Sequence, residues 1–440
     1  MLFNQQIKQI FSPKYVVPTF HQLSVCDKQG RVFFYKNRVY RGIFKDHENQ
    51  VQALIESNFF KNLMHAGWFV KTSVSTKKVS GFNLVLKHER LLSSHQTEWS
   101  FSMLKEAVIF LLKFQQVLNT QGYQLLDGHL YNILFKNNFP IYIDLGSIIP
   151  LTEQSHFYDE VLYLAIYPLI LYAMNERFLA SSILSYHNYM RTIPVQNIEH
   201  SELVQIKMEA FFKKHHLPFD LKLLYEPAFL EKFITPPFKE DTLWGGYQSD
   251  FYQGQNLERF KRYEIIASYI DKYVSEKRPS ICDLAGNQGA MLYYLEQKKI
   301  RNFRLMTNVD YDENAIELSL NELRQRGSKI GSYLFNFMLP KRDLYQDFKH
   351  DVVLALAVTH HLILSQGFLI DAIFEQIKRY TNQYVFIEFM PLGLWNGHEA
   401  PDLPPWYTLD WFEKHFKKYF KLLHKDAYEE NRILFIGKVV

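Results

Sequence analysis

The strongest constraint on the fold is a regular alternation of apolar runs and helix-like stretches in the last part of the chain. Helices are predicted in the first four gaps between the apolar runs, and near 408–418 before the sixth run. The first runs are apolar almost throughout, which is typical of parallel strands covered by helices on both faces. Only a few residues around Glu430 separate the last two runs, so these predict an antiparallel hairpin. The pattern predicts an α/β fold with a doubly wound sheet and an antiparallel last strand. Its strands are expected at 280–284, 303–310, 332–337, 351–358, 383–389, 419–426 and 432–439.

The composition changes at residues 235–254, which hold two prolines, three glycines and no helical periodicity. Such a segment is typical of a linker or a crossing loop. A chain of 440 residues is long enough for two or three domains. We therefore predict a first domain at 1–238 and a second at 239–440.

The first of these domains is expected to be of the α+β type. Residues 20–45 predict short strands with a turn at 27–30. Helical periodicity or composition predicts helices near 47–65, over 101–120 and in the stretch 155–235. Two further short strands are predicted at 133–135 and 141–143.

A loop of small residues joins the first predicted strand of the second domain to its helix. It reads Asp283-Leu-Ala285-Gly286-Asn287-Gln-Gly289 and is similar to the Asp-x-Gly-x-Gly-x-Gly loop with which methyltransferases bind S-adenosylmethionine. Alanine and asparagine are the least disruptive replacements for the two missing glycines, and asparagine tolerates a positive φ. We expect all five named residues to bind S-adenosylmethionine, with the Asp283 carboxylate facing the ammonium group directly or through water.

Three further candidates for the cofactor site follow the next two strands. Asp310 ends the second strand about 20 residues after the loop, where a carboxylate can bind both ribose hydroxyls. Asn336 ends the third strand and is a candidate for the adenine edge, or simply a turn residue. Tyr311 is a candidate for flanking the adenine, or an ordinary surface tyrosine. A loop followed by an acid also fits a dinucleotide site, but the GxGxxG spacing is missing. A degenerate fold that binds no cofactor also remains open.

The fourth and fifth strands end in side chains that can move a proton. His360 and His361 follow the fourth strand, and the carboxyl ends of such strands face the ligand crevice. An imidazole with a pKa of about 6.5 suits a general base. We expect one histidine to face the crevice and the other to pack against the next helix, and packing alone explains either equally well. Glu388 is a candidate for orienting a histidine, binding a substrate hydroxyl or amine, or acting as the base.

The first domain carries a motif with kinase-like spacing. Asp127 and Asn132, followed by Asp144, match the residues that hold metal and the accepting hydroxyl in kinases. No glycine-rich loop precedes the strands near 31–44, and Arg41 stands in the expected place of the strand lysine, where arginine is a poor substitute. The motif predicts a kinase-like domain that is not an active kinase. Nucleotide binding, phosphotransfer and a chance match remain open alternatives.

Charge and cysteine content narrow the possible partners. The 50 Lys+Arg residues only slightly exceed the 46 Asp+Glu residues and are scattered, so we expect no nucleic-acid partner. The two cysteines, Cys26 and Cys282, lie far apart without metal-ligand spacing, so no metal site is predicted and a reducing cytoplasm is favoured. The longest apolar run, 161–174, is too short to span a membrane.

Both halves together resemble a bacterial family of two-part class I S-adenosylmethionine-dependent methyltransferases, some of them labelled host-specific nodulation proteins. The resemblance covers nearly the whole chain, although Gly128 and His129 stand where a small residue and a proline are expected. It implies a Rossmann-like domain that methylates a hydroxyl or amine of a small molecule or glycan precursor. A bifunctional kinase and methyltransferase of surface glycans, or a scaffold with an inactive methyltransferase fold, are the alternatives. The resemblance rests on His88–Arg90, Glu98–Lys105, Asp127–Asn132, Ile143–Ser147, Asp283–Gly289, Leu354–Leu362 and Ile387–Pro391.

Overall fold

The structure is a computed structural model that describes residues 15–16, 18–20, 27–36, 38–186, 202–237, 242, 244–340, 345–395, 398 and 402–440. Cys26 lies outside these residues. The chain divides into two compact units. Unit 1 consists of residues 1–92, 105–135 and 140–235, and unit 2 consists of residues 93–104, 136–139 and 236–440.

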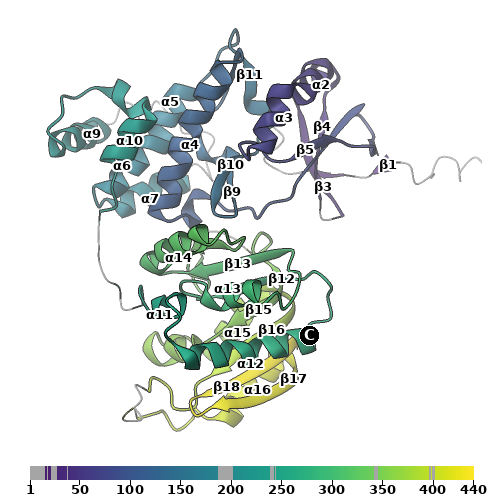
Figure 1. The fold of residues 1–440 in the computed structure, drawn as a ribbon, viewed down its shortest axis with the longest axis vertical. Coiled ribbons are helices and arrows are strands. Elements are labelled where there is room, and N and C mark those ends of the chain that lie inside the picture. Colours follow the sequence, from purple (N-terminus) through teal and green to yellow (C-terminus); the bar gives the residue numbers. More distant parts are fainter. Residues whose placement is uncertain are drawn as a thin grey trace, which may run out of the picture. The chain divides into compact units, whose positions relative to one another are not determined.

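Unit 2 is built on a seven-stranded sheet with the order β14-β13-β12-β15-β16-β18-β17 (Figure 1). The strands from β14 to β16 pair in parallel, whereas β18 pairs antiparallel with both of its neighbours. The predicted antiparallel hairpin at the end of the chain is therefore confirmed. The strands are β12 (Ser280–Leu284), β13 (Leu305–Asp310), β14 (Gly331–Leu334), β15 (His350–Ala355), β16 (Thr381–Phe389), β17 (Phe420–Glu429) and β18 (Arg432–Val439).

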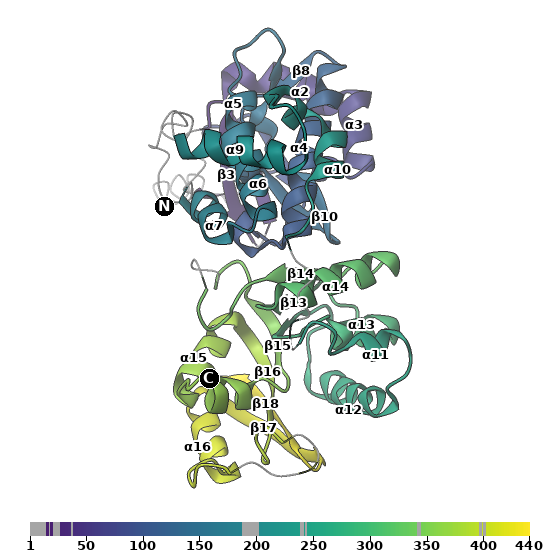
Figure 2. The ribbon, with the colours of Figure 1, turned by 90° about the vertical axis from the view of Figure 1, so that its left-hand side faces the viewer.

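Helices cover both faces of this sheet, as its apolar strands require. Figure 2 shows α12 (Leu257–Tyr273) and α13 (Ala290–Gln297) on one side, and α15 (Ile370–Tyr380) and α16 (Leu409–Tyr419) on the other. On the first side, apolar residues of α12 and α13 form one core cluster with alternate residues of the central strands, such as Ile281 and Leu354. On the second side, Phe412 and Phe416 of α16 pack on Phe435 of β18.

The prediction of a helix in each of the first four gaps is wrong for the third gap. The described residues between β14 and β15, 335–340 and 345–349, form turns and no helix. Asn336 begins one of these turns, because its side-chain oxygen accepts hydrogen bonds from the backbone N–H groups of Met338 and Leu339. Pro340 follows and disfavours continued helix. The remaining predicted helices of this half correspond to α13, α14 (Glu313–Gln325), α15 and α16.

Two short stretches from the first half of the chain belong to unit 2. In one of them, Asn138 is 1% exposed and lies against the edge of the sheet. Its side-chain nitrogen donates to the carbonyl oxygen of Ile330 (2.7 Å), and its side-chain oxygen accepts from the N–H of Ser332 (2.9 Å). The amide thus pairs with the backbone as a neighbouring strand would. The other stretch, 93–104, includes the start of α4 (Phe101–Asn119). The backbone N–H groups of Phe101 and Ser102 donate to the carboxylates of Glu313 and Glu317.

Unit 1 is an α+β unit. Its five-stranded antiparallel sheet has the order β2-β3-β4-β7-β5, and β9–β10 and β8–β11 form two small strand pairs. Among the described residues of the chain, no helix has the length and apolar character needed to cross a membrane. The main strands are β2 (Thr19–Phe20), β3 (Gly30–Tyr35), β4 (Arg38–Ile43), β5 (Thr72–Val74), β7 (Leu84–His88), β8 (Tyr123–Leu125), β9 (Ile133–Lys136), β10 (Phe139–Tyr142) and β11 (Ile148–Pro150). The helices are α2 (Glu48–Glu56), α3 (Asn58–His65), α4, α5 (Phe157–Val161), α6 (Tyr167–Ala173), α7 (Arg177–Tyr186), α9 (Glu202–Lys214) and α10 (Pro227–Phe233).

Asn138→Ala is expected to lower the free energy of unfolding by about 1–3 kcal/mol, because two buried backbone groups lose their partner. Asn137→Ala is the matched control. Both asparagines have positive φ, 65° and 52°, but Asn137 is exposed. Urea denaturation of the full chain measures both effects. Equal losses in the two variants would mean that backbone conformation, and not the paired amide, is what Asn138 contributes.

Candidate active site

The candidate site lies at the carboxyl edge of the unit 2 sheet, where the strand order changes direction. β12 has β13 on one side and β15 on the other, so the loops that follow these strands diverge there. Such a switch point is where open α/β sheets bind ligands. Asp283 at the end of β12 is close enough to Asp310 and Glu388 for their charges to affect its pKa. Three of the predicted site residues are therefore brought together.

The loop after β12 has the backbone that its glycine-like motif requires. Ala285, Asn287 and Gly289 all have positive φ, at 59°, 53° and 76°. A left-handed conformation costs an L-residue about 1–2 kcal/mol, which Ala285 bears. At Gly286 the constraint is space, because an added Cβ would lie 2.3 Å from the side-chain oxygen of Asn308. The loop is therefore locally strained where its backbone passes close to the sheet edge.

Asp310 at the end of β13 is tied to this loop. One carboxylate oxygen accepts a hydrogen bond from the N–H of Asn287 (2.8 Å), and the other accepts from the N–H of Asp312 (2.9 Å). Burial raises the pKa of Asp310 to about 6, and these backbone hydrogen bonds hold it down. The carboxylate has more lone pairs than these backbone donors use, so it can accept a further hydrogen bond. The neighbouring Tyr311 is 53% exposed, so it lies at the surface beside the site.

Three acceptor atoms at this edge are buried without a hydrogen-bond donor within the described part of the chain. They are one side-chain oxygen each of Asp283, Asn287 and Asn308. Burial, together with the nearby charges of Asp310 and Glu388, raises the pKa of Asp283 to about 8. Orphaned buried acceptors are costly, so several in one place point to a ligand that brings donors. An ammonium group and ribose hydroxyls are such donors, and S-adenosylmethionine carries both.

The segment predicted to be a linker or crossing loop packs directly on the loop after β12. The carbonyl oxygens of Trp244 and Gly245 accept from the side chains of Asn287 (2.7 Å) and Gln288 (2.5 Å). The Tyr252 hydroxyl donates to the carbonyl oxygen of Gln288 (2.8 Å). The segment therefore covers the candidate site, which sequence reasoning missed because it contains no helical or strand periodicity.

The two histidines follow β15, and the second begins a short π-helical turn (His361–Ser365). Their ring centroids lie 4.0 Å apart, and the ring of Trp244 meets His361 edge-on at 4.8 Å. Burial, then His361 and Arg432, lowers the pKa of His360 to about 3. Burial also lowers the pKa of His361. Both imidazoles are therefore neutral at physiological pH, and more weakly basic than the ordinary value expected from the sequence.

Glu388 is fully buried, and both of its carboxylate oxygens are engaged. One lies 2.7 Å from a guanidinium nitrogen of Arg432, and the other accepts a hydrogen bond from the Tyr428 hydroxyl. Arg432 also pairs with Glu429 (3.0 Å). Sequence reasoning missed Arg432 and Tyr428. The predicted hairpin was the available signal, since its antiparallel register places the start of β18 beside the end of β16.

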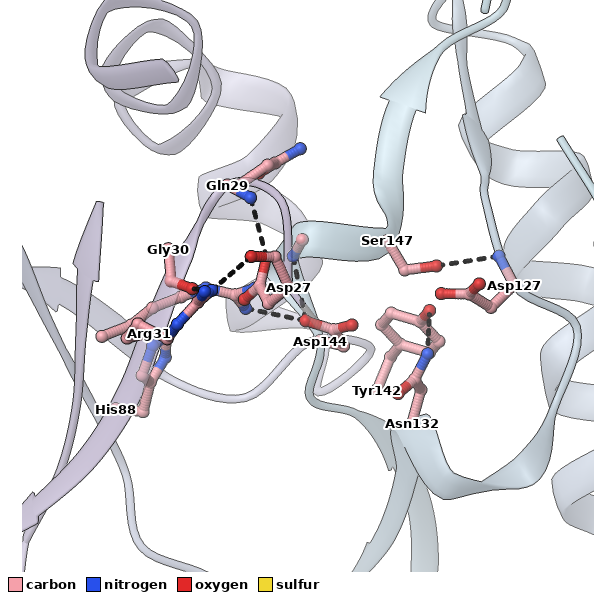
Figure 3. Close-up of polar contacts among 12 residues, drawn as sticks. Asp27, Gln29, Gly30, Arg31, His88, Asp127, Asn132, Tyr142, Asp144 and Ser147 are labelled. Atoms are coloured by element: carbon pink, nitrogen blue, oxygen red, sulfur yellow. Dashed lines mark hydrogen bonds and ion pairs between the residues drawn. The ribbon is translucent and has the colours of Figure 1, made fainter. Parts of the chain in front are cut away.

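In unit 1, the residues with kinase-like spacing form a separate polar cluster (Figure 3). Arg41 is buried and bridges Asp144 (2.7 Å) and Asp27. Its charge, together with hydrogen bonds, lowers the pKa of Asp144 although burial raises it. The Asn132 side chain donates to the hydroxyl of Tyr142 (3.2 Å). Arg41, Asn132 and Asp144 are therefore each bound to protein groups.

No protein-family model matches the chain. The chain is 21% identical over 422 residues to nodulation protein NoeA of Rhizobium meliloti, covering 84% of each protein. An S-adenosylmethionine-dependent methyltransferase from Clostridium acetobutylicum covers 44% of the chain and 96% of its own length, at 13% identity and a TM-score of 0.32. The 16S rRNA methylase ArmA covers 46% of the chain and all of its own length, at 18% identity and a TM-score of 0.34.

Asp283→Asn is expected to stabilise the protein without ligand as pH rises. The folded-state pKa of about 8 lies above the ordinary value of 3.8 that applies in the unfolded chain, so the wild type loses stability as pH rises from about 4 to 8. Asparagine does not ionise and so removes that loss. The free energy of unfolding of the variant should exceed that of the wild type by about 1–3 kcal/mol at pH 8, and should equal it near pH 4. Thermal unfolding at both pH values measures it. Asp351→Asn is the control with opposite sign, because hydrogen bonds and Arg304 lower the pKa of Asp351. A pH-independent effect of Asp283→Asn would contradict this account.

Glu388→Gln is expected to cost about 3–5 kcal/mol of stability, because it leaves the buried Arg432 guanidinium without its main counter-charge. Glu429→Gln removes a half-exposed partner of the same arginine and should cost about 1 kcal/mol or less. Chemical denaturation of the two variants compares them. Similar losses would show that Glu388 is not the group that compensates Arg432.

Proposed function

We propose that the chain is an S-adenosylmethionine-dependent methyltransferase that acts on a hydroxyl or amine of a small molecule or glycan precursor in the cytoplasm. The observation that carries the proposal is the set of orphaned buried acceptors at the switch point of the sheet. A dinucleotide site would instead need a close-packed Gly-rich loop for pyrophosphate, and the Asp283–Gly289 loop has an acidic residue at its start.

Each predicted cofactor residue has a role in this proposal. Asp283 faces the ammonium group, and the spare lone pairs of Asp310 accept from the ribose hydroxyls. The backbone of the loop passes close to the cofactor at Ala285, Gly286, Asn287 and Gly289. Asn336 uses its side-chain oxygen for its own turn, so only its side-chain nitrogen is offered to the adenine edge. Tyr311 flanks the adenine from the surface.

S-adenosylmethionine supplies a sulfonium methyl group, and the protein has to position the acceptor and take its proton. His361 is the better candidate for the base, because it is less buried than His360 and lies beside Trp244. A neutral imidazole can take a proton without first losing one. Glu388 is a positioning residue, since it holds Arg432 in place next to His360. Trp244 and its neighbours help to exclude water from the site.

Unit 1 is proposed not to transfer phosphate. Arg41 neutralises Asp144, the residue that would hold metal in a kinase. A bifunctional kinase and methyltransferase is therefore disfavoured. An RNA acceptor, suggested by the likeness to ArmA, finds no support in the net charge of only +4.

Asp310→Ala is expected to weaken S-adenosylmethionine binding at least about 100-fold, because the ribose loses its charged acceptor and the loop loses its anchor. Calorimetric titration of the purified full chain measures the affinity. Asp351→Asn is the control, since Asp351 lies at the opposite, amino end of the same sheet. Absence of binding by the wild type would favour the scaffold alternative, and unchanged binding by Asp310→Ala would refute the assigned ribose contact.

A further inference from the structure

A second group of ligand-type side chains lies in unit 1. Asp127, His129 and Glu160 each offer one ligand atom, and all three atoms lie within 4.8 Å of one another. Ligand atoms bound to one metal ion at about 2.0–2.2 Å lie at most about 4.4 Å apart, so small side-chain rotations bring this group to coordination distance.

The backbone of the loop that carries Asp127 and His129 is held against α5, which carries Glu160. Gly128 lies between Asp127 and His129 and packs so tightly on α5 that an added Cβ would lie 2.2 Å from the carbonyl oxygen of Phe157. The Gly128 N–H donates to a carboxylate oxygen of Glu160 (2.9 Å). The Asp127 N–H donates to the hydroxyl of Ser147 (3.0 Å). The backbone of residues 127–128 is therefore fixed beside α5, and one carboxylate oxygen of Glu160 is tied to it.

The charges in the cluster favour a cation. Asp127 and Glu160 are partly buried carboxylates close enough to repel each other. A divalent ion between the two carboxylates would replace this repulsion by attraction, and the imidazole would supply a third ligand.

This site differs from the one that kinases use for metal. Kinases hold magnesium with the asparagine and the second aspartate of the motif. Here the corresponding Asn132 and Asp144 are bound to Tyr142 and Arg41. Asp127, His129 and Glu160 instead combine one nitrogen and two oxygen ligands, a set suited to Mn²⁺ or Zn²⁺ more than to Mg²⁺.

We propose that Asp127, His129 and Glu160 bind one divalent transition-metal ion in unit 1. Three protein ligands leave coordination positions open, so the ion can bind water or an anionic ligand as well as cross-link the 127–129 loop to α5. The inference is independent of the methyltransferase proposal, because all three residues belong to unit 1.

Titration of chelator-treated, tag-free full-length protein with MnCl₂ tests the proposal by calorimetry. The wild type should bind one ion per chain, and His129→Asn or Glu160→Gln should weaken binding at least about tenfold. Asp159→Asn is the matched control, since Asp159 is the exposed acid next to Glu160 on α5 and should leave the affinity unchanged. Equal binding by all variants, or no binding by the wild type, overturns the site.

A spectroscopic readout on the wild type does not depend on the folding of any variant. Pulsed electron paramagnetic resonance of the Mn²⁺-loaded protein should detect coupling to a ¹⁴N nucleus, because the proposed site includes one imidazole. Bound Mn²⁺ without nitrogen coupling would place the ion on carboxylates elsewhere and would also overturn the site.

Discussion

The arrangement of unit 2 depends on one costly feature, a carboxyl group buried at the carboxyl edge of the sheet. Asp283 is 3% exposed, and one of its oxygens accepts no hydrogen bond within the described residues. Its neighbours Asp310 and Glu388 are also acids, so their charges add to the cost of ionising it. Proteins retain such groups at sites where a ligand compensates them. The strained loop, the cover formed by residues 244–252 and the orphaned asparagine oxygens all surround this carboxyl group.

Two buried arginines, Arg432 in unit 2 and Arg41 in unit 1, form ion pairs with neighbouring acids. In unit 2, Arg432 binds Glu388, which leaves Asp283 and Asp310 as the acids available to a ligand. In unit 1, Arg41 binds the two aspartates that it bridges, Asp27 and Asp144. In both units a buried arginine therefore decides which carboxylates are held in ion pairs. Arginine suits this role because its charge persists when buried and its several N–H donors can engage two carboxylates.

The sequence predicted the central strands of unit 2 well because β12, β15 and β16 are largely apolar runs. It failed in the third gap, where Pro340 and the side-chain turn of Asn336 replace a helix. The role of Asn138 could not be found in advance, because an amide that imitates a strand is recognisable only once its neighbours are known. The positive φ of Ala285 and Asn287 agrees with the glycine-like motif. The low pKa of His360 and the engagement of Glu388 depend on burial and pairing, which periodicity does not reveal.

The most direct test of the central claim is the number of protons released when S-adenosylmethionine binds, measured by titration calorimetry at pH 6.5 in buffers of different ionisation enthalpy. With a pKa of about 8, Asp283 is protonated at that pH and should ionise beside the incoming ammonium group. The account therefore predicts release of about one proton per bound ligand, and little release with methylthioadenosine, which lacks the ammonium group. Binding of S-adenosylmethionine with no buffer-dependent heat would contradict the claim that Asp283 receives the ammonium group.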